Sequence, residues 1–177
     1  MSAPFDVVVF GATGFTGRLV AEYLNSRYGM GGGVAWAIAG RDLDKLAALR
    51  RQIGAPATLP LLQGNAAEAA SLAALARQAR VVISTVGPYQ LHGEPLVRAC
   101  AEAGTDYVDL CGEPAWMARM IARYKPDPIS DQRCNSYWSL YLALAVLPSH
   151  LTPSGCPRIH RSSSGISLDG YSRNLSL

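Results

Sequence analysis

The sequence predicts an α/β protein, a Rossmann-like doubly wound parallel sheet followed by an irregular C-terminal tail. Between residues 5 and 124, short apolar runs typical of strands alternate with amphipathic stretches typical of helices, and this alternation indicates a parallel sheet. Three glycines, Gly11, Gly14 and Gly17, lie between the first strand and the first helix. We therefore expect one domain over residues 1–125 and the irregular tail, disordered in part, over residues 126–177.

The first half of the domain contains three expected strands, each followed by a helix. The strands are expected at residues 6–10, 34–39 and 58–62, the last weakened by Pro60. The helices are expected at residues 16–28, 43–53 and 68–79, with Asp42 as the N-cap of the second and Gly54 after its end. The apolar residues expected to face the sheet are Leu19, Val20, Tyr23 and Leu24 in the first helix, and Leu43, Leu46, Ala47 and Ile53 in the second.

The second half continues the alternation. Strands are expected at residues 81–86 and 107–110, and helices at 95–103, ended by Gly104, and at 114–124. The carboxyl ends of parallel strands lie at one edge of a sheet, where ligands bind at the point of strand-order reversal. Four segments should therefore converge, and they are residues 11–17, 40–41, 87–89 and 109–113.

Composition excludes several classes of protein. The chain has 177 residues, 49% hydrophobic and 16% charged, which indicates a globular protein. The net charge is +3 and the basic residues are scattered, so we expect no nucleic-acid partner. No signal peptide and no apolar run near the ~20 residues of a membrane span are visible. The four cysteines show no C-x-x-C pair, so we expect no metal and a reducing, cytoplasmic setting.

The glycine stretch carries the prediction of a dinucleotide cofactor. Gly11 lets the chain leave the strand, Gly14 leaves room for a diphosphate, and Gly17 lets the helix approach the strand. The first turn of the helix then presents free N–H groups to an anion. The candidate cofactor-binding residues here are Gly11, Ala12, Thr13, Gly14, Phe15, Thr16 and Gly17.

The end of the second strand favours NADP over NAD. NAD-binding domains carry an Asp or Glu there for the ribose 2′-hydroxyl, whereas this chain has Gly40 and Arg41. A guanidinium group binds phosphate well, so we expect Arg41 to bind the 2′-phosphate. The alternative is that Arg41 is a solvated surface cation.

The sequence leaves the catalytic residues open. No tyrosine has a lysine four residues later, as short-chain dehydrogenases require, and neither a G-x-S-x-G element nor a P-loop ending is present. Polar candidates near the expected edge are Thr85, Tyr89, His92, Asp109 and Glu113. The alternatives are that His92 is an ordinary loop residue, that Tyr89 forms a wall beside the nicotinamide, and that Glu113 favours a helix N-terminus.

Five segments together resemble one known family. They are VVVFGATGFTG from residue 7, AIAGRDLDKL from 37, VISTVGPY from 82, GEPLVRAC from 93 and GTDYVDLCGE from 104. In this order they resemble the N-terminal domain of saccharopine dehydrogenase-like oxidoreductases, especially the branch with the trans-acting enoyl reductases. The resemblance implies an NADP-linked oxidoreductase that moves a hydride between the cofactor and a C=C or C=N bond of a small-molecule substrate.

The resemblance also implies roles for the remaining segments. Residues Thr85, Val86, Gly87, Pro88 and Tyr89 map onto the loop beside the nicotinamide, and Asp109, Gly112 and Glu113 onto the loop entering the substrate region. Family members are about twice as long, and residues 125–177 resemble no part of them, so we expect an altered or truncated C-terminus. The rival hypotheses are an NADP-binding module without turnover and a non-catalytic remnant.

Overall fold

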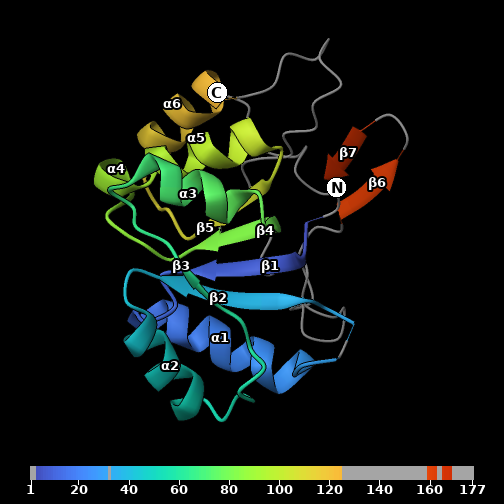
Figure 1. The fold of residues 1–177 in the computed structure, drawn as a ribbon. Helices are drawn as coiled ribbons and strands as arrows, with labels where there is room; N and C mark the ends of the chain where they lie inside the picture. The colour runs from blue at the N-terminus through green and yellow to red at the C-terminus, as the bar shows by residue number, and fades with distance from the viewer. Residues whose placement is uncertain (1–2, 32, 125–158, 163–164, 169–177) are drawn as a thin grey trace. The chain divides into compact units, whose positions relative to one another are not determined.

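The computed structural model describes residues 3–31, 33–124, 159–162 and 165–168. The chain divides into two compact units, Met1–Ser139 and Leu140–Leu177. The first unit contains a five-stranded parallel sheet (Figure 1). Its strands are β1 (Phe5–Phe10), β2 (Trp36–Gly40), β3 (Leu61–Gln63), β4 (Ala79–Ser84) and β5 (Asp106–Asp109). Its helices are α1 (Phe15–Tyr28), α2 (Leu43–Gln52), α3 (Ala69–Ala76), α4 (Tyr89–His92), α5 (Glu94–Ala103) and α6 (Pro114–Tyr124).

The strand order is β3-β2-β1-β4-β5, so the direction of winding reverses at β1. Val8 of β1 is in register with Ala37 of β2 on one side and with Val82 of β4 on the other. All pairs are parallel, which confirms the predicted doubly wound sheet. The ends of β1 and β4 therefore form the switch point where ligands of such sheets bind.

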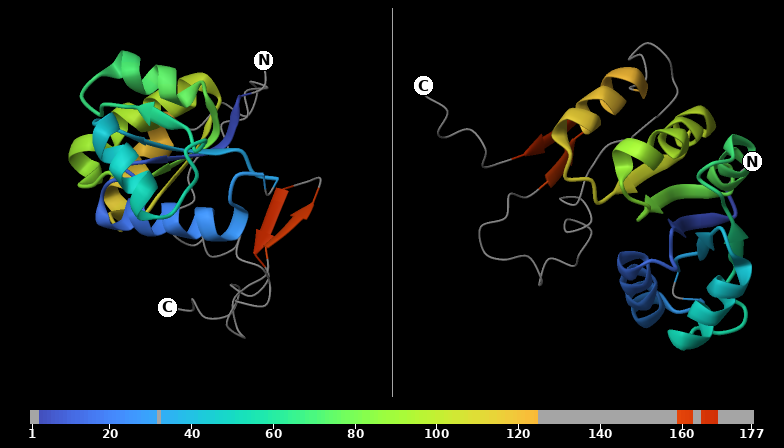
Figure 2. Two further views of the ribbon diagram at one scale, coloured as in Figure 1. Left: turned by 60° about the horizontal axis from the view of Figure 1, so that its bottom comes forward. Right: turned by 90° about the vertical axis from the view of Figure 1, so that its left-hand side faces the viewer.

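The sheet lies between two helical layers, with α1 and α2 on one face and α3, α5 and α6 on the other (Figures 1 and 2). Each layer has its own apolar core, because successive residues of a strand point to opposite faces. Val8 and Phe10 pack with α3, α5 and α6, while Val9 packs with α1 and α2. The alternation along each strand therefore determines which side chains pack against each helical layer.

The inner face of α1 differs from the sequence prediction. Leu19 and Tyr23 were expected to face the sheet, but they are 45% and 41% exposed. Leu24 is buried as expected, and the rest of the buried stripe consists of Gly17 and Ala21. Because Gly17 and Ala21 are small, the helix lies close to the sheet on this face. The larger Leu19 and Tyr23 therefore lie toward the side of the helix that faces solvent. Leu43 of α2 is likewise 43% exposed, while Leu46 is buried as expected.

Several element boundaries also differ from expectation. Pro60 lies before β3, which begins only at Leu61, since proline cannot donate a ladder hydrogen bond. The third helix ends at Ala76 and not at residue 79, because Ala79 already begins β4. The short helix α4 was not predicted. The expected N-cap is confirmed, since the Asp42 side chain accepts from the Lys45 amide at 3.0 Å.

The second unit contains two strands where an irregular tail was expected. β6 (Ile159–Ser162) and β7 (Gly165–Leu168) pair antiparallel, with Ile159 opposite Leu168 and Ser162 opposite Gly165. Residues 137–147 are mildly apolar and by their sequence could form a short helix, but they lie outside the described residues. The boundary between domain and tail at residues 125 and 126 stays a prediction.

An ion pair at the amino-terminal edge of the sheet gives a pH-dependent prediction. Asp6 accepts from the Ala35 amide and from the Arg80 guanidinium, both at 2.9 Å, and these bonds, the amide first, lower the pKa of Asp6. Such a carboxylate stabilises the fold above its unfolded pKa of about 3.9, and this contribution is lost as pH falls through the lower folded value.

We expect Asp6→Asn to lower the urea midpoint at pH 7 and to have a smaller effect at about pH 3, where the parent carboxyl group is losing its charge. Urea unfolding followed by circular dichroism at the two pH values measures this difference. An equal loss at both values would contradict a charge-dependent role for Asp6.

Candidate functional site

The residues 11–17 form the turn from β1 into α1, at the carboxyl edge of the sheet. Gly11 has φ +84°, a conformation that side chains with a Cβ rarely adopt. The amides of Gly11 and Ala12 both donate to the Ala39 carbonyl of β2, at 2.9 and 3.2 Å. The start of the turn is therefore anchored to the neighbouring strand, and the side chain of Ala12 is buried in the core.

The free amides lie further along the turn. The Gly14 amide donates to the Gly11 carbonyl at 3.0 Å, so the turn uses this group itself. Gly14 is the N-cap of α1 and has no side chain to cap the helix. The amides of Thr13, Phe15, Thr16 and Gly17 have no acceptor within the part of the chain that the structure describes. They are free to bind an anion, and the positive end of the helix dipole favours one there.

Gly17 explains how the turn and the helix pack so closely. A Cβ on Gly17 would overlap the Gly11 carbonyl oxygen and lie 2.7 Å from the Ala12 Cα. Both neighbours are backbone and cannot rotate away. A Cβ on Gly14 would meet only the Gly11 carbonyl, at 3.3 Å. A side chain at Gly14 would thus meet one tight backbone contact, whereas the space beside Gly17 is filled by protein.

The second predicted segment follows β2. Gly40 is buried and ends the strand, and Arg41 comes next with an exposed side chain. The Gln63 side chain donates to the Arg41 carbonyl at 3.4 Å, which joins the ends of β2 and β3. The Asp42 side chain accepts from the Lys45 amide and so caps α2. Arg41 is therefore available to an anion at this edge of the sheet.

The third segment follows β4 and contacts the glycine turn directly. The Thr85 hydroxyl is 3.0 Å from the Phe10 carbonyl and 3.1 Å from that of Gly11. A Cβ on Gly11 would lie 2.7 Å from the Val86 Cγ2. The structure thus brings residues 85–86 against residue 11, as expected from the topology. The Gly87–Pro88 peptide bond that follows is cis.

Tyr89 is held by its hydroxyl group. The hydroxyl donates to the Ser84 carbonyl at 3.2 Å and accepts from the Leu110 amide at 3.3 Å. Burial raises the pKa of Tyr89. Its ring packs on Trp116 with 6.0 Å between the centroids. A hydroxyl with both bonds made and a raised pKa suits a wall of the site better than a proton donor.

The fourth segment is organised by Asp109, which is only 6% exposed at the end of β5. One carboxylate oxygen accepts from the Tyr107 hydroxyl at 2.8 Å, and the other from the Cys111 amide at 2.9 Å. Burial raises the pKa of Asp109, and the Cys111 amide and Tyr107 hydroxyl counter part of this effect. Burial also raises the pKa of the Cys111 thiol, which argues against a nucleophilic thiolate.

The hydrogen bond from Tyr107 to Asp109 was not predicted from the sequence. Tyr107 and Asp109 are two residues apart on one strand, so their side chains point to the same face. That spacing was the available signal. The packing role of Trp116 was also not predicted. Its ring fills the space beside Gly93, where a Cβ would lie 2.6 Å from Trp116 Cζ2.

The two remaining polar candidates differ in environment. His92 ends α4 and its side chain is exposed. Glu113 lies at the start of α6, where its carbonyl accepts from the Trp116 and Met117 amides at 3.0 Å. Its carboxylate oxygen Oε2 is buried and has no hydrogen-bond donor within residues 3–31 and 33–124. Glu113 therefore has an unsatisfied buried acceptor, and His92 does not contribute to this cluster.

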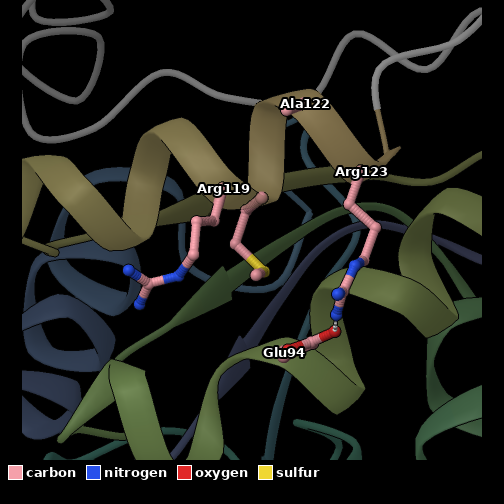
Figure 3. A pocket seen from close by; sticks show the side chains of 5 residues that line it. Glu94, Arg119, Ala122 and Arg123 are labelled. Carbon is pink, nitrogen blue, oxygen red and sulfur yellow. Dashed lines mark hydrogen bonds and ion pairs between the residues drawn. The ribbon is translucent and has the colours of Figure 1, made fainter.

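A separate cavity of about 520 Å³ lies between α5 and α6, lined by Glu94, Arg119, Met120, Ala122 and Arg123. Figure 3 shows Arg123 directed toward Glu94 and Arg119 directed away from it. The Glu94 carboxylate accepts from Arg123 and, at 2.9 Å, from the Tyr124 hydroxyl. None of the residues predicted for the site lines this cavity. The described residues contain no cluster that could hold a metal ion and no helix able to span a membrane.

Comparison with known families identifies the type of domain to which this edge of the sheet belongs. The sequence model described as the saccharopine dehydrogenase NADP binding domain matches residues 7–138. The chain belongs to this family. The match covers the turn at residues 11–17 and the three other segments at the sheet edge. The described first unit is thus an NADP-binding domain, and the preference for NADP over NAD is confirmed.

Curated relatives extend the comparison. A candidate trans-acting enoyl reductase of Mycobacterium tuberculosis is 49% identical over 121 residues, which are 68% of this chain and 28% of that protein. A lipid droplet localized protein of Caenorhabditis elegans is 44% identical over 126 residues, 68% of this chain and 29% of that protein. The chain therefore spans less than a third of the length of these relatives.

A solved structure supports the fold. The apo saccharopine dehydrogenase (L-Glu forming) of Saccharomyces cerevisiae aligns with a TM-score of 0.52 and 23% identity, over 66% of this chain and 24% of that one. The similarity confirms the Rossmann-like sheet.

Proposed function

We propose that this domain binds NADP(H) across the switch point between β1 and β4, as the cofactor domain of an oxidoreductase. The diphosphate binds the free amides of Phe15, Thr16 and Gly17, and the 2′-phosphate binds Arg41. Residues 85–89 lie beside the nicotinamide. The observation that carries this proposal is the row of unpaired amides at a helix N-terminus without a side-chain cap.

The residues present fit a dinucleotide. A Cβ on Gly14 would meet only the Gly11 carbonyl oxygen, so little protein lies on this side of the turn, and the close packing at Gly17 holds the free amides of the first turn of α1 near the end of β1. Arg41 is exposed at the end of β2, on the side of the sheet where the adenosine half would lie. The other half would then extend past β4 toward Tyr89 and Asp109. These contacts span the edge from β2 to β5, which suits an elongated ligand.

The cofactor supplies a hydride from C4 of its nicotinamide ring. The chain's own residues bind and orient it. The turn fixes the diphosphate, and the bonded hydroxyl of Tyr89 holds its ring as a rigid wall. We infer a small-molecule substrate with a C=C or C=N bond, based on the resemblance to the enoyl reductases and to saccharopine dehydrogenase. We also infer a cytoplasmic protein from the cysteine pattern.

Arg41→Ala tests the proposed cofactor contact. Loss of a charge-assisted contact should weaken NADPH binding by about 1–3 kcal/mol, while NADH binding stays unchanged because NADH has no 2′-phosphate. Titration of the full chain with each cofactor, followed by nicotinamide fluorescence, measures both. The matched control is Arg51→Ala, another exposed arginine, at the end of α2. Equal losses for NADPH and NADH, or equal parent affinities, would remove this role from Arg41.

A second function is cofactor binding without turnover. It is favoured by the family model that matches, which describes an NADP binding domain. Catalysis in such enzymes needs a closed site that excludes water. Oxidation of bound NADPH in the presence of activated C=C or C=N acceptors would support the oxidoreductase. Binding without oxidation of NADPH by any of them would support the binding module.

A further inference from the structure

Glu113 is a charged group that the cofactor contacts above leave unused. Its buried Oε2 atom has no hydrogen-bond donor in the described part of the chain. An unpartnered buried carboxylate oxygen is costly, and a positive charge placed nearby reduces that cost. The helix that follows does not satisfy it, because Pro114 at the start of α6 has no amide hydrogen.

Two hydrogen bonds connect the loop that contains Glu113 to the nicotinamide side of the proposed site. The Thr85 hydroxyl bonds the Gly11 carbonyl, so the loop after β4 lies directly against the glycine turn. The Leu110 amide donates to the Tyr89 hydroxyl, which joins that loop to the loop after β5. Glu113 is three residues along this loop from the Leu110 amide that holds Tyr89. Its charge is the smallest of the contributions that raise the pKa of Tyr89, after burial and the charges of Asp109 and Cys111.

The position of Glu113 is fixed by its backbone. Its amide donates to the Cys111 Sγ at 3.4 Å, and Cys111 is itself held by the carboxylate of Asp109. Asp109 has both oxygens engaged, whereas the buried Oε2 of Glu113 has no hydrogen-bond donor among the described residues, so the charge of Glu113 is not compensated there. No described arginine or lysine pairs with Glu113.

We propose that Glu113 sets the relative affinity for the two redox states of the cofactor, an inference that rests on the proposed function. The oxidised nicotinamide ring carries a positive charge and the reduced ring is neutral. A fixed carboxylate on the nicotinamide side therefore stabilises bound NADP+ more than bound NADPH. Glu113 is a positioning and electrostatic residue in this role, and no bond to it forms or breaks.

Binding of both redox states to Glu113→Gln tests the proposal. Removing the charge while keeping the shape should weaken NADP+ by about three- to tenfold, the order expected for one partly screened charge near another, and change NADPH less than about twofold. Equilibrium dialysis of the full chain with each form measures the two dissociation constants. Glu102→Gln, which neutralises an exposed glutamate in α5, should leave the ratio at the parent value.

Two further variants keep the proposal falsifiable. Glu113→Asp keeps the charge and should keep most of the preference, and Glu113→Ala is a second neutral variant if Gln disturbs folding, which circular dichroism reports. Equal weakening of both redox states, or none, in a folded neutral variant would overturn the role of Glu113. A parent chain that binds neither form would overturn the proposed function itself, and with it this inference.

Discussion

Gly17→Ala is expected to lower the free energy of unfolding by about 3 kcal/mol and to abolish measurable NADPH binding. The added methyl group would overlap the Gly11 carbonyl oxygen and press on the Ala12 Cα. These are backbone atoms anchored to Ala39 of β2, so relief requires the helix to move away from the strand. That movement displaces the free amides at the start of α1 and removes the proposed diphosphate site.

Variants at two other glycines distinguish an effect on packing from an effect on NADPH binding. Gly112→Ala adds a methyl group with no neighbour within 4 Å and with ordinary backbone angles, so stability should stay unchanged. Gly14→Ala should cost less stability than Gly17→Ala, since its methyl group would press on one backbone oxygen at 3.3 Å and not overlap it, but should weaken NADPH binding. Urea unfolding and nicotinamide fluorescence measure the two effects. A Gly17→Ala chain as stable as the parent would show that the close approach is not required.

The sheet was predictable because the signals for its strands are local. The apolar runs 7–10 in β1 and 81–83 in β4 are typical of buried parallel strands, and Gly11 follows the first directly while Gly87 and Pro88 follow shortly after the second. The inner face of α1 was not predictable from apolar periodicity. Glycine and alanine carry little hydrophobic signal, yet Gly17 and Ala21 form the buried stripe because close approach matters more there than side-chain size.

The location of the candidate site could be predicted from the strand topology. The sheet edge brings residues 11 and 85 together, as the expected parallel order required. Which amides are free was not predictable, because the Gly14 amide is used by a hydrogen bond inside the turn. The Tyr107–Asp109 bond depends on burial at the end of β5, and an unpartnered oxygen on Glu113 can be found only from the packed structure.

Trp116→Ala is expected to lower the free energy of unfolding by about 3–5 kcal/mol, the usual cost of removing a buried tryptophan. Trp116 is 3% exposed, packs on the Tyr89 ring and fills the space beside Gly93. Its removal leaves Tyr89 with its hydroxyl bonds but without support for the ring. NADPH binding should therefore weaken as well, because the wall on the nicotinamide side loses its fixed position.

The matched control is Trp36→Ala on the opposite face of the sheet. Trp36 is 1% exposed and packs among α1 and α2, far along the chain from the loop that contains Tyr89. We expect a similar loss of stability in urea unfolding but, at temperatures where both variants are folded, little change in NADPH affinity. The milder Trp116→Phe provides a folded comparison if alanine is not tolerated. Equal effects of the Trp116 and Trp36 variants on NADPH binding would mean that Trp116 stabilises the domain without supporting the site.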